Sequence, residues 1–84
     1  MKVSSQQLVE LIDFSPSLDF QAKVRWRGYV PYLKADDRDR LYKFLSDEKL
    51  DITNVLKQKL KGFRGYYFAK GIEELEQEFM KNLS

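Results

Sequence analysis

The feature that most constrains the fold is a helical repeat of apolar residues near the C-terminal end of the chain. Apolar residues recur at spacings of three, four, one and three positions, opposite charged and polar residues, at Ile72, Leu75, Phe79, Met80 and Leu83. This spacing predicts an amphipathic helix with one apolar face. Because the chain has 84 residues and no cysteine, the core that covers this face must come from apolar packing alone or be extended across a partner.

Two further segments show clear helix signals. A first helix is predicted from Ser4 or Ser5, because serine caps helix N-termini and apolar residues with helical spacing follow. The segment Ala35–Leu45 begins with acidic residues, which interact favourably with the positive end of a helix dipole. It is therefore predicted to be a helix that stops near Ser46.

After a short polar connection over Ser46–Lys49, another helix is predicted from Asp51 or Thr53, where either side chain can act as the N-terminal cap. Its apolar seam consists of Ile52, Val55, Leu56 and Leu60. Together these segments predict a single all-α domain over residues 1–84, built as a bundle of four to five short helices.

The segment from Leu18 to Tyr29 fits two periodicities. Apolar residues four and three apart indicate a helix, but strict alternation of apolar and polar residues over 20–26 indicates a strand. A lone strand needs a partner, and only residues 63–69 offer one. We therefore favour a helix and keep, as the alternative, an α+β fold that pairs residues 20–26 with 63–69.

The composition bears on the chemistry of the protein. The chain has no histidine and no cysteine, so the usual general bases, nucleophiles and metal ligands are missing. The carboxylates of Asp36, Asp37 and Asp39 are explained by their place at the start of a helix. We therefore predict a non-enzymatic protein with no cofactor and no metal. Because no disulfide, signal peptide or apolar stretch of about 20 residues is visible, we also predict a cytoplasmic location.

Basic residues are concentrated in two segments. Residues 21–34 contain four lysine or arginine residues and no acidic residue, and residues 55–70 contain five and none. Because the chain has 15 basic and 13 acidic residues in all, the remainder is acidic. If the two segments adjoin in the fold, they form a positive face that suits a polyanion or an acidic protein. The other interpretation is that these side chains pair with glutamates or lie in solvent.

The first functional hypothesis is that the chain binds another protein or a second copy of itself. The sequence has more apolar residues than a small helical core readily hides, so some of them are expected at the surface. Tryptophan, tyrosine and arginine are enriched at the centres of protein interfaces. The candidate partner-binding residues are Arg25, Trp26, Arg27, Tyr29 and Tyr32. For Trp26, a place in the core is the competing interpretation.

The second hypothesis is nucleic-acid binding. Residues 39–75 resemble the helical core of a helix-turn-helix or winged-helix domain, although Gln58 stands where that family usually has a small residue and no wing hairpin follows. The resemblance is carried by Leu41, Phe44, Leu45, Ile52, Val55, Leu56, Leu60, Gly62, Arg64, Tyr67 and Lys70. It implies that the basic and aromatic residues after the turn face DNA. With the basic segments 23–34 and 57–70, the candidate contacts are Lys57, Lys61, Arg64, Tyr66, Tyr67 and Lys70.

Overall fold

The structure is a computed structural model, and it describes residues 3–58 and 65–83. In these two ranges the chain forms helices and no strand: α1 (Ser5–Phe14), α2 (Phe20–Tyr29), the short 3-10 helix η1 (Val30–Tyr32), α3 (Ala35–Gln58) and α4 (Gly65–Leu83). The prediction of a small all-α bundle is confirmed. The alternative α+β fold is wrong, because residues 20–26 lie in α2 and residues 65–69 lie in α4. Residues 63 and 64 lie outside the described ranges.

The two shorter helices begin at polar caps. The Ser4 hydroxyl accepts a hydrogen bond from the backbone N–H of Gln7, and the Gln7 side chain accepts one from the backbone N–H of Ser4. This reciprocal capping box satisfies two N–H groups at the start of α1. The carboxylate of Asp19 accepts a hydrogen bond from the N–H of Ala22 at 2.7 Å and so caps α2.

The strand-like alternation in residues 20–26 has a helical explanation. Ala22 and Trp26, one turn apart, are buried in the core, whereas Phe20 and Val24 are exposed. Successive turns of α2 therefore carry apolar residues on both its inner and its outer face. Read along the chain, two such stripes give the same alternation as a half-buried strand.

The helix α3 is a single element of 24 residues, so the predicted stop near Ser46 is wrong. No glycine or proline occurs between Ala35 and Gln58, and the polar residues at the expected connection continue the helix. Thr53 does not cap a new helix, because its hydroxyl donates a hydrogen bond to the carbonyl of Lys49 one turn earlier, at 2.9 Å.

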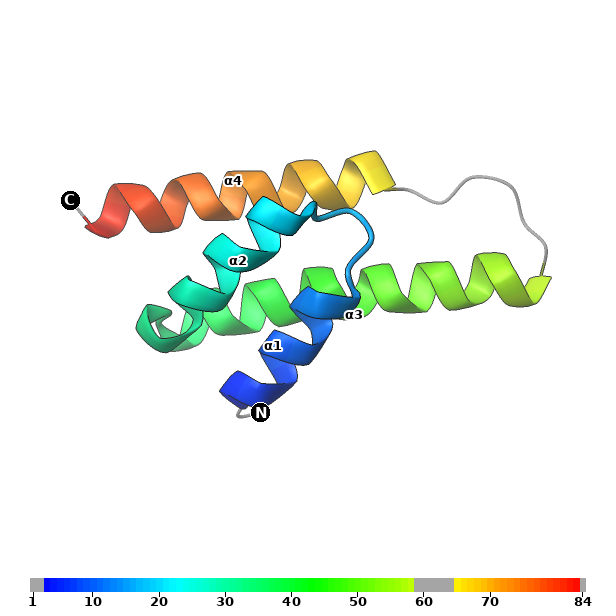
Figure 1. The fold of residues 1–84 in the computed structure, drawn as a ribbon, viewed down its shortest axis with the longest axis horizontal. Coiled ribbons are helices and arrows are strands. Elements are labelled where there is room, and N and C mark those ends of the chain that lie inside the picture. The colour runs from blue at the N-terminus through cyan, green and yellow to red at the C-terminus, as the bar shows by residue number, and fades with distance from the viewer. Residues whose placement is uncertain (1–2, 59–64, 84) are drawn as a thin grey trace.

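The helices α3 and α4 run antiparallel, and α1 and α2 lie across them on one side (Figure 1). The described part of residues 39–75 therefore contains portions of two long helices rather than the three short helices of a helix-turn-helix core. The core is formed where the four α-helices meet, by Leu8, Ile12, Leu18, Ala22, Trp26, Val30, Leu33, Leu41, Leu45, Ile72, Leu75 and Phe79. The predicted apolar face of α4 is confirmed for Ile72, Leu75 and Phe79, whereas Met80 is exposed and the side chain of Leu83 lies outside the described residues.

Candidate protein-binding surface

The residues predicted to bind a partner belong mostly to the contacts that hold α2 in place. Trp26 has 1% of its surface exposed, so it is a core residue. Its indole ring meets the ring of Tyr29 edge to face, with centroids 5.3 Å apart. Tyr29 in turn packs on Phe79 of α4, with ring centroids 5.0 Å apart. These aromatic contacts contribute to stability and leave the face of Trp26 closed to a partner.

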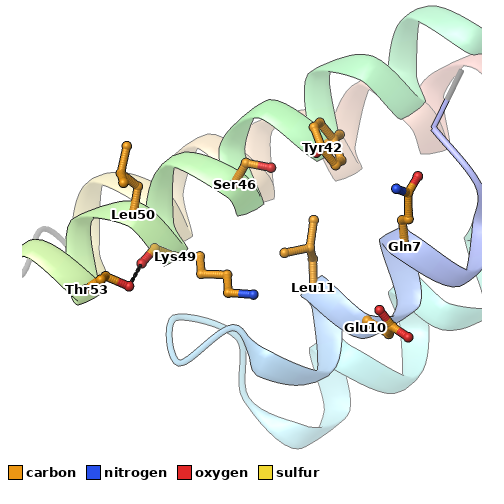
Figure 2. Close-up of a pocket in the computed structure, with 8 residues that line it drawn as sticks. All are labelled: Gln7, Glu10, Leu11, Tyr42, Ser46, Lys49, Leu50 and Thr53. Carbon is orange, nitrogen blue, oxygen red and sulfur yellow. Dashed lines mark hydrogen bonds between the residues drawn. The ribbon is translucent and has the colours of Figure 1, made fainter. Parts of the chain in front are cut away.

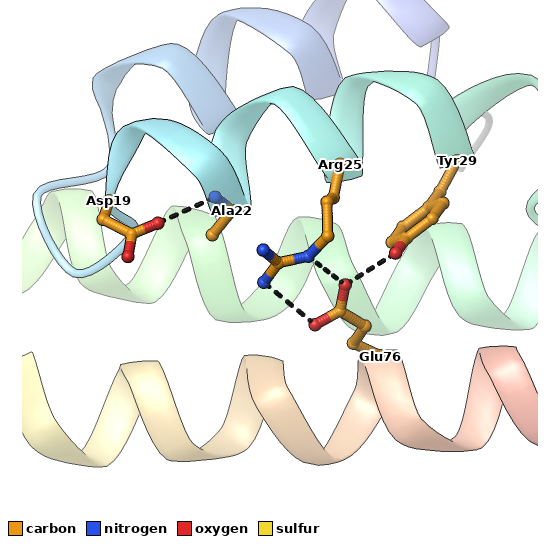
Figure 3. Close-up of polar contacts among 5 residues, drawn as sticks. All are labelled: Asp19, Ala22, Arg25, Tyr29 and Glu76. Atoms are coloured by element: carbon orange, nitrogen blue, oxygen red, sulfur yellow. Dashed lines mark hydrogen bonds and ion pairs between the residues drawn. The ribbon is translucent and has the colours of Figure 1, made fainter.

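Arg25 and Tyr29 converge on one carboxylate of α4 (Figure 3). The Arg25 guanidinium donates from Nε to Oε2 of Glu76 at 2.9 Å and from an Nη atom to Oε1 at 3.4 Å. The Tyr29 hydroxyl donates to Oε2 of the same carboxylate at 2.8 Å. The hydrogen bond to Glu76 raises the pKa of Arg25, and burial followed by the hydrogen bond to Glu76 raises the pKa of Tyr29 above 10.0. This cluster joins α2 to α4.

The remaining two candidates on this side differ in their contacts. Arg27 forms an ion pair with Asp13 of α1, with Nε and Oδ1 3.2 Å apart, and Lys23 donates to the Asp13 backbone carbonyl at 2.9 Å. These contacts join α2 to α1. Tyr32, in η1, is exposed.

The residues predicted to bind nucleic acid are only partly described. Lys61 and Arg64, and the side chain of Lys57, lie outside the described residues. Tyr66 and Tyr67 are exposed in the first turn of α4, and the Lys70 ammonium lies 5.9 Å from the centre of the Tyr66 ring.

The groove between α2 and α4 has acidic as well as basic residues in its lining. Its volume is about 320 Å³, and the carboxylates of Asp19, Glu73 and Glu76 lie there together with Arg25. The surface around this groove is therefore not uniformly positive. Of the two interpretations of the basic segments, pairing with acidic residues is thus found for Arg25 and Arg27.

A larger groove lies between α1 and α3 and has a volume of about 440 Å³. It is lined by Gln7, Glu10 and Leu11 of α1 and by Tyr42, Ser46, Lys49, Leu50 and Thr53 of α3. Figure 2 shows Leu11 and Lys49 pointing into the space between the two helices, while Leu50 stands at the rim and points away from α1. The α3 residues of the lining recur at spacings of four, three, one and three positions, so one side of α3 forms the whole wall.

Apolar surface continues from this groove in two directions. At one side, Phe14 at the end of α1 is exposed, and the Lys49 ammonium lies 5.4 Å from the centre of its ring. At the other side, Leu50 also lines a smaller groove of about 180 Å³ between α3 and α4, together with Tyr67. We name Leu11, Phe14, Leu50 and Tyr67, with the two grooves that they line or border, the Leu50 surface.

Leu50 is the most informative residue of this surface. It is 60% exposed, although leucine is a residue type that is usually buried. It lies on the ridge of α3 that separates the two grooves, so a ligand seated in either groove contacts it. Carboxylates surround it, those of Asp47 and Asp51 in the smaller groove and of Glu10 in the larger one.

The sequence alone does not single out this surface. A helix that ends near Ser46 leaves the direction of Leu50 undefined, because the residue then falls at the start of another element. In a continuous α3, Leu50 is nine and five residues after the buried Leu41 and Leu45, which places it off the inward stripe. The sequence signal for this surface is therefore an apolar residue that does not share the helical spacing of the core residues. It can be recognised only when α3 is known to be one continuous helix.

The buried polar pair of the fold does not form a reactive site. Ser15 ends α1 and is fully buried, and its hydroxyl donates to Oε1 of Glu48, which is also buried. Among the described residues, Oε2 of Glu48 has no hydrogen-bond partner. Because neither side chain reaches solvent, this pair is closed to a substrate, and it fixes the loop after α1 on α3.

Within the described ranges, acidic side chains do not gather in groups of three or more that could hold a metal ion. In the same part of the chain, each helix is too short or too polar to cross a membrane. Comparison with protein-family models, with curated proteins and with solved structures gave no match to this chain. The surface geometry is therefore the basis for a functional proposal.

Proposed function

We propose that the protein is a non-enzymatic binding module that receives an amphipathic helix of another protein on the Leu50 surface. The observation that carries this proposal is the position of Leu50, 60% exposed on a ridge between two grooves. Exposed apolar side chains that line or border a groove are typical of sites that take the apolar face of a helix.

The dimensions of the larger groove support a helical ligand. Its α3 wall extends from Tyr42 to Thr53, which is about 16 Å at the rise of an α-helix. That length accommodates about three helical turns, and a helix uses apolar side chains spaced three, four and seven positions apart to fill such a groove. The side chains of Leu11 and Leu50 provide apolar contact for these positions.

The charges of the groove define the flanks of the ligand. Glu10, Asp47 and Asp51 outnumber Lys49 around Leu50, so the ligand is expected to carry lysine or arginine beside its apolar stripe. Full burial of one leucine side chain contributes about 1.5–3 kcal/mol, which makes Leu50 the expected centre of the interface.

The test is selection of amphipathic helical peptides from a displayed library against the folded protein, followed by titration of a selected peptide. Leu50→Asp is expected to weaken binding at least about tenfold, because it puts a charge at the apolar centre. Met80→Asp is the matched control: Met80 is also an exposed apolar residue, but it lies near the other end of the molecule, on α4. Peptides that bind Leu50→Asp as tightly as the unchanged protein would refute the proposal. Circular dichroism of both variants verifies that they remain helical.

Nucleic-acid binding is the second candidate, and one observation supports it. Tyr66 is 80% exposed with the Lys70 ammonium above its ring, an arrangement that suits base stacking beside a phosphate. Fluorescence anisotropy with random DNA and RNA at two salt concentrations tests it, because binding to phosphates weakens steeply as salt rises. Absence of binding at low salt eliminates this candidate.

A further inference from the structure

We propose that the helix received by the Leu50 surface is α2 of a second copy of this chain, which presents its outer face. This inference rests on the proposed function, because it identifies the partner of the same surface. It is carried by an apolar stripe on α2, by the charges beside that stripe and by the length of the helix.

The outer face of α2 carries the apolar stripe. Phe20 is 78% exposed and Val24 is 49% exposed, and they lie one turn apart on the side opposite the buried Ala22 and Trp26. Two large apolar side chains on the solvent face of a helix of 10 residues form a stripe that its own domain leaves uncovered. Side chains four positions apart lie on the same face of a helix, and helix-binding grooves accommodate apolar side chains with this spacing.

The charges of the two surfaces are of opposite sign. From Phe20 to Tyr29, α2 has three basic residues, Lys23, Arg25 and Arg27, and no acidic residue. Two of these are paired within the chain, Arg25 with Glu76 and Arg27 with Asp13. Lys23 donates to a backbone carbonyl, and that contact does not neutralise its charge beside the stripe. In the larger groove Glu10 is matched by Lys49, and the excess of carboxylates comes from Asp47 and Asp51 in the smaller groove on the other side of Leu50. The attraction therefore acts between Lys23 and that side of the α3 ridge.

The lengths of the two surfaces also agree. From Phe20 to Tyr29, α2 extends about 14 Å, and the α3 wall of the larger groove extends about 16 Å. The whole of α2 can therefore lie along the groove, with Phe20 and Val24 directed at Leu11 and Leu50.

The two faces are different parts of the same chain, which determines how copies assemble. When α2 of one copy occupies the groove of the next, the first copy keeps an empty groove and the second keeps a free α2 face. Such a head-to-tail contact is heterologous, and it grows into a ring or an open chain instead of stopping at a symmetric dimer. The mean mass in solution is therefore expected to rise with protein concentration.

The experiment uses two variants, each of which removes one face. Phe20→Asp removes the apolar stripe of α2 and leaves the groove intact, whereas Leu50→Asp removes the groove and leaves α2 intact. Each variant alone is expected to be monomeric in light scattering after size exclusion. Mixed in equal amounts, they are expected to form a one-to-one dimer, because the Phe20→Asp copy supplies its groove and the Leu50→Asp copy supplies its α2.

Two control variants test whether the assembly depends on these two faces in particular. Met80→Asp is expected to assemble like the unchanged protein, and Val24→Asp repeats the first variant at the other position of the stripe. Both stripe residues are exposed, so either change should leave the protein folded, and an unchanged circular dichroism spectrum verifies this.

Two results would overturn the inference. A monomer at every concentration of the unchanged protein excludes self-assembly, and an assembly that is not restored by mixing the two variants indicates a different interface. Neither result bears on the proposed function, which stands if a selected helical peptide still binds in a manner that depends on Leu50. Conversely, peptides that bind Leu50→Asp as tightly as the unchanged protein refute the proposed function, whatever the assembly state.

Discussion

Replacement of Gly71 by alanine is a sharp test of how α3 and α4 meet. Gly71 lies in the interior of α4, where the ring of Phe44 from α3 approaches the helix backbone. A Cβ atom added at position 71 would lie 2.5 Å from Cε1 of Phe44 and 2.8 Å from Cζ. Carbon atoms in contact are normally about 3.5–4.0 Å apart, so either the ring or the helix must shift.

Two opposing effects set the magnitude. Alanine in a helix interior is more favourable than glycine by about 1 kcal/mol. Overpacking a well-filled contact costs about 1–3 kcal/mol. Because Phe44 is half-buried and its ring has some room to move, we expect a net loss of about 1 kcal/mol in the free energy of unfolding. For a domain of this size that loss lowers the melting temperature by about 4–8 °C.

The assay is urea unfolding followed by circular dichroism, with Gly28→Ala as the matched control. An added Cβ at Gly28 in α2 meets no atom within 4 Å, so this change should raise stability by up to about 1 kcal/mol. In a Phe44→Leu background, where the ring is absent, Gly71→Ala should become stabilising as well. If Gly71→Ala stabilises the unchanged protein as much as Gly28→Ala does, the close approach of α3 and α4 at Phe44 is refuted.

Three further predictions concern the core and the α2–α4 junction. Ser15→Ala should lower the unfolding free energy by about 1.5–3 kcal/mol in a urea titration, because it removes the hydrogen bond to the buried Glu48 carboxylate. Glu48→Met should be neutral or stabilising in the same titration, because it replaces the buried carboxylate by an apolar side chain. Trp26→Ala should cost about 3–5 kcal/mol, and a smaller loss would show that the indole is not central to the core. Because the pKa of Tyr29 is raised in the folded state, its contribution to stability is present below pH 10.0 and is lost as the pH rises through the raised pKa. In an ultraviolet titration Tyr29 should ionise above pH 10.0, and Tyr29→Phe should remove that late phase.

Local signals in the sequence predict much of the fold. The serine cap of α1 and the apolar stripe of α4 each depend on residues within a few positions of one another, so they can be read from the chain alone. The helical state of residues 20–26 requires a choice between two periodicities. Asp19, which caps α2, is the local feature that favours the helix.

Long-range contacts cannot be predicted in this way. The carboxylate that receives Arg25 and Tyr29 comes from Glu76, which is 51 residues beyond Arg25 and is one of several glutamates on α4. Only the packing of α2 beside α4 selects it. The sequence therefore predicts that the aromatic and basic residues of α2 contact a partner, whereas most of them hold the chain together.

The candidate surface illustrates the same limit. The side of the molecule on which Leu50 lies cannot be predicted from the sequence, because the polar run Ser46–Lys49 suggests a break in the helix. That run is polar because Ser46 and Lys49 line the groove, not because the helix ends there. These polar residues in the middle of α3 thus lie at the edge of a candidate binding surface. When they are interpreted as a loop, the surface is not predicted.

The junctions of α4 with its two neighbours differ in kind, and this has a consequence for motion. Against α3, the ring of Phe44 rests on the α4 backbone at Gly71, which has no side chain to hold the helices apart. Towards α2, the contact passes through the long side chains of Arg25 and Tyr29 to Glu76. Side chains of this length change their torsion angles without moving a helix backbone, so the spacing of α2 and α4 is fixed less tightly than the spacing of α3 and α4. Amide hydrogens in the middle of α4 should therefore exchange as slowly as those of α3 and more slowly than those of α2.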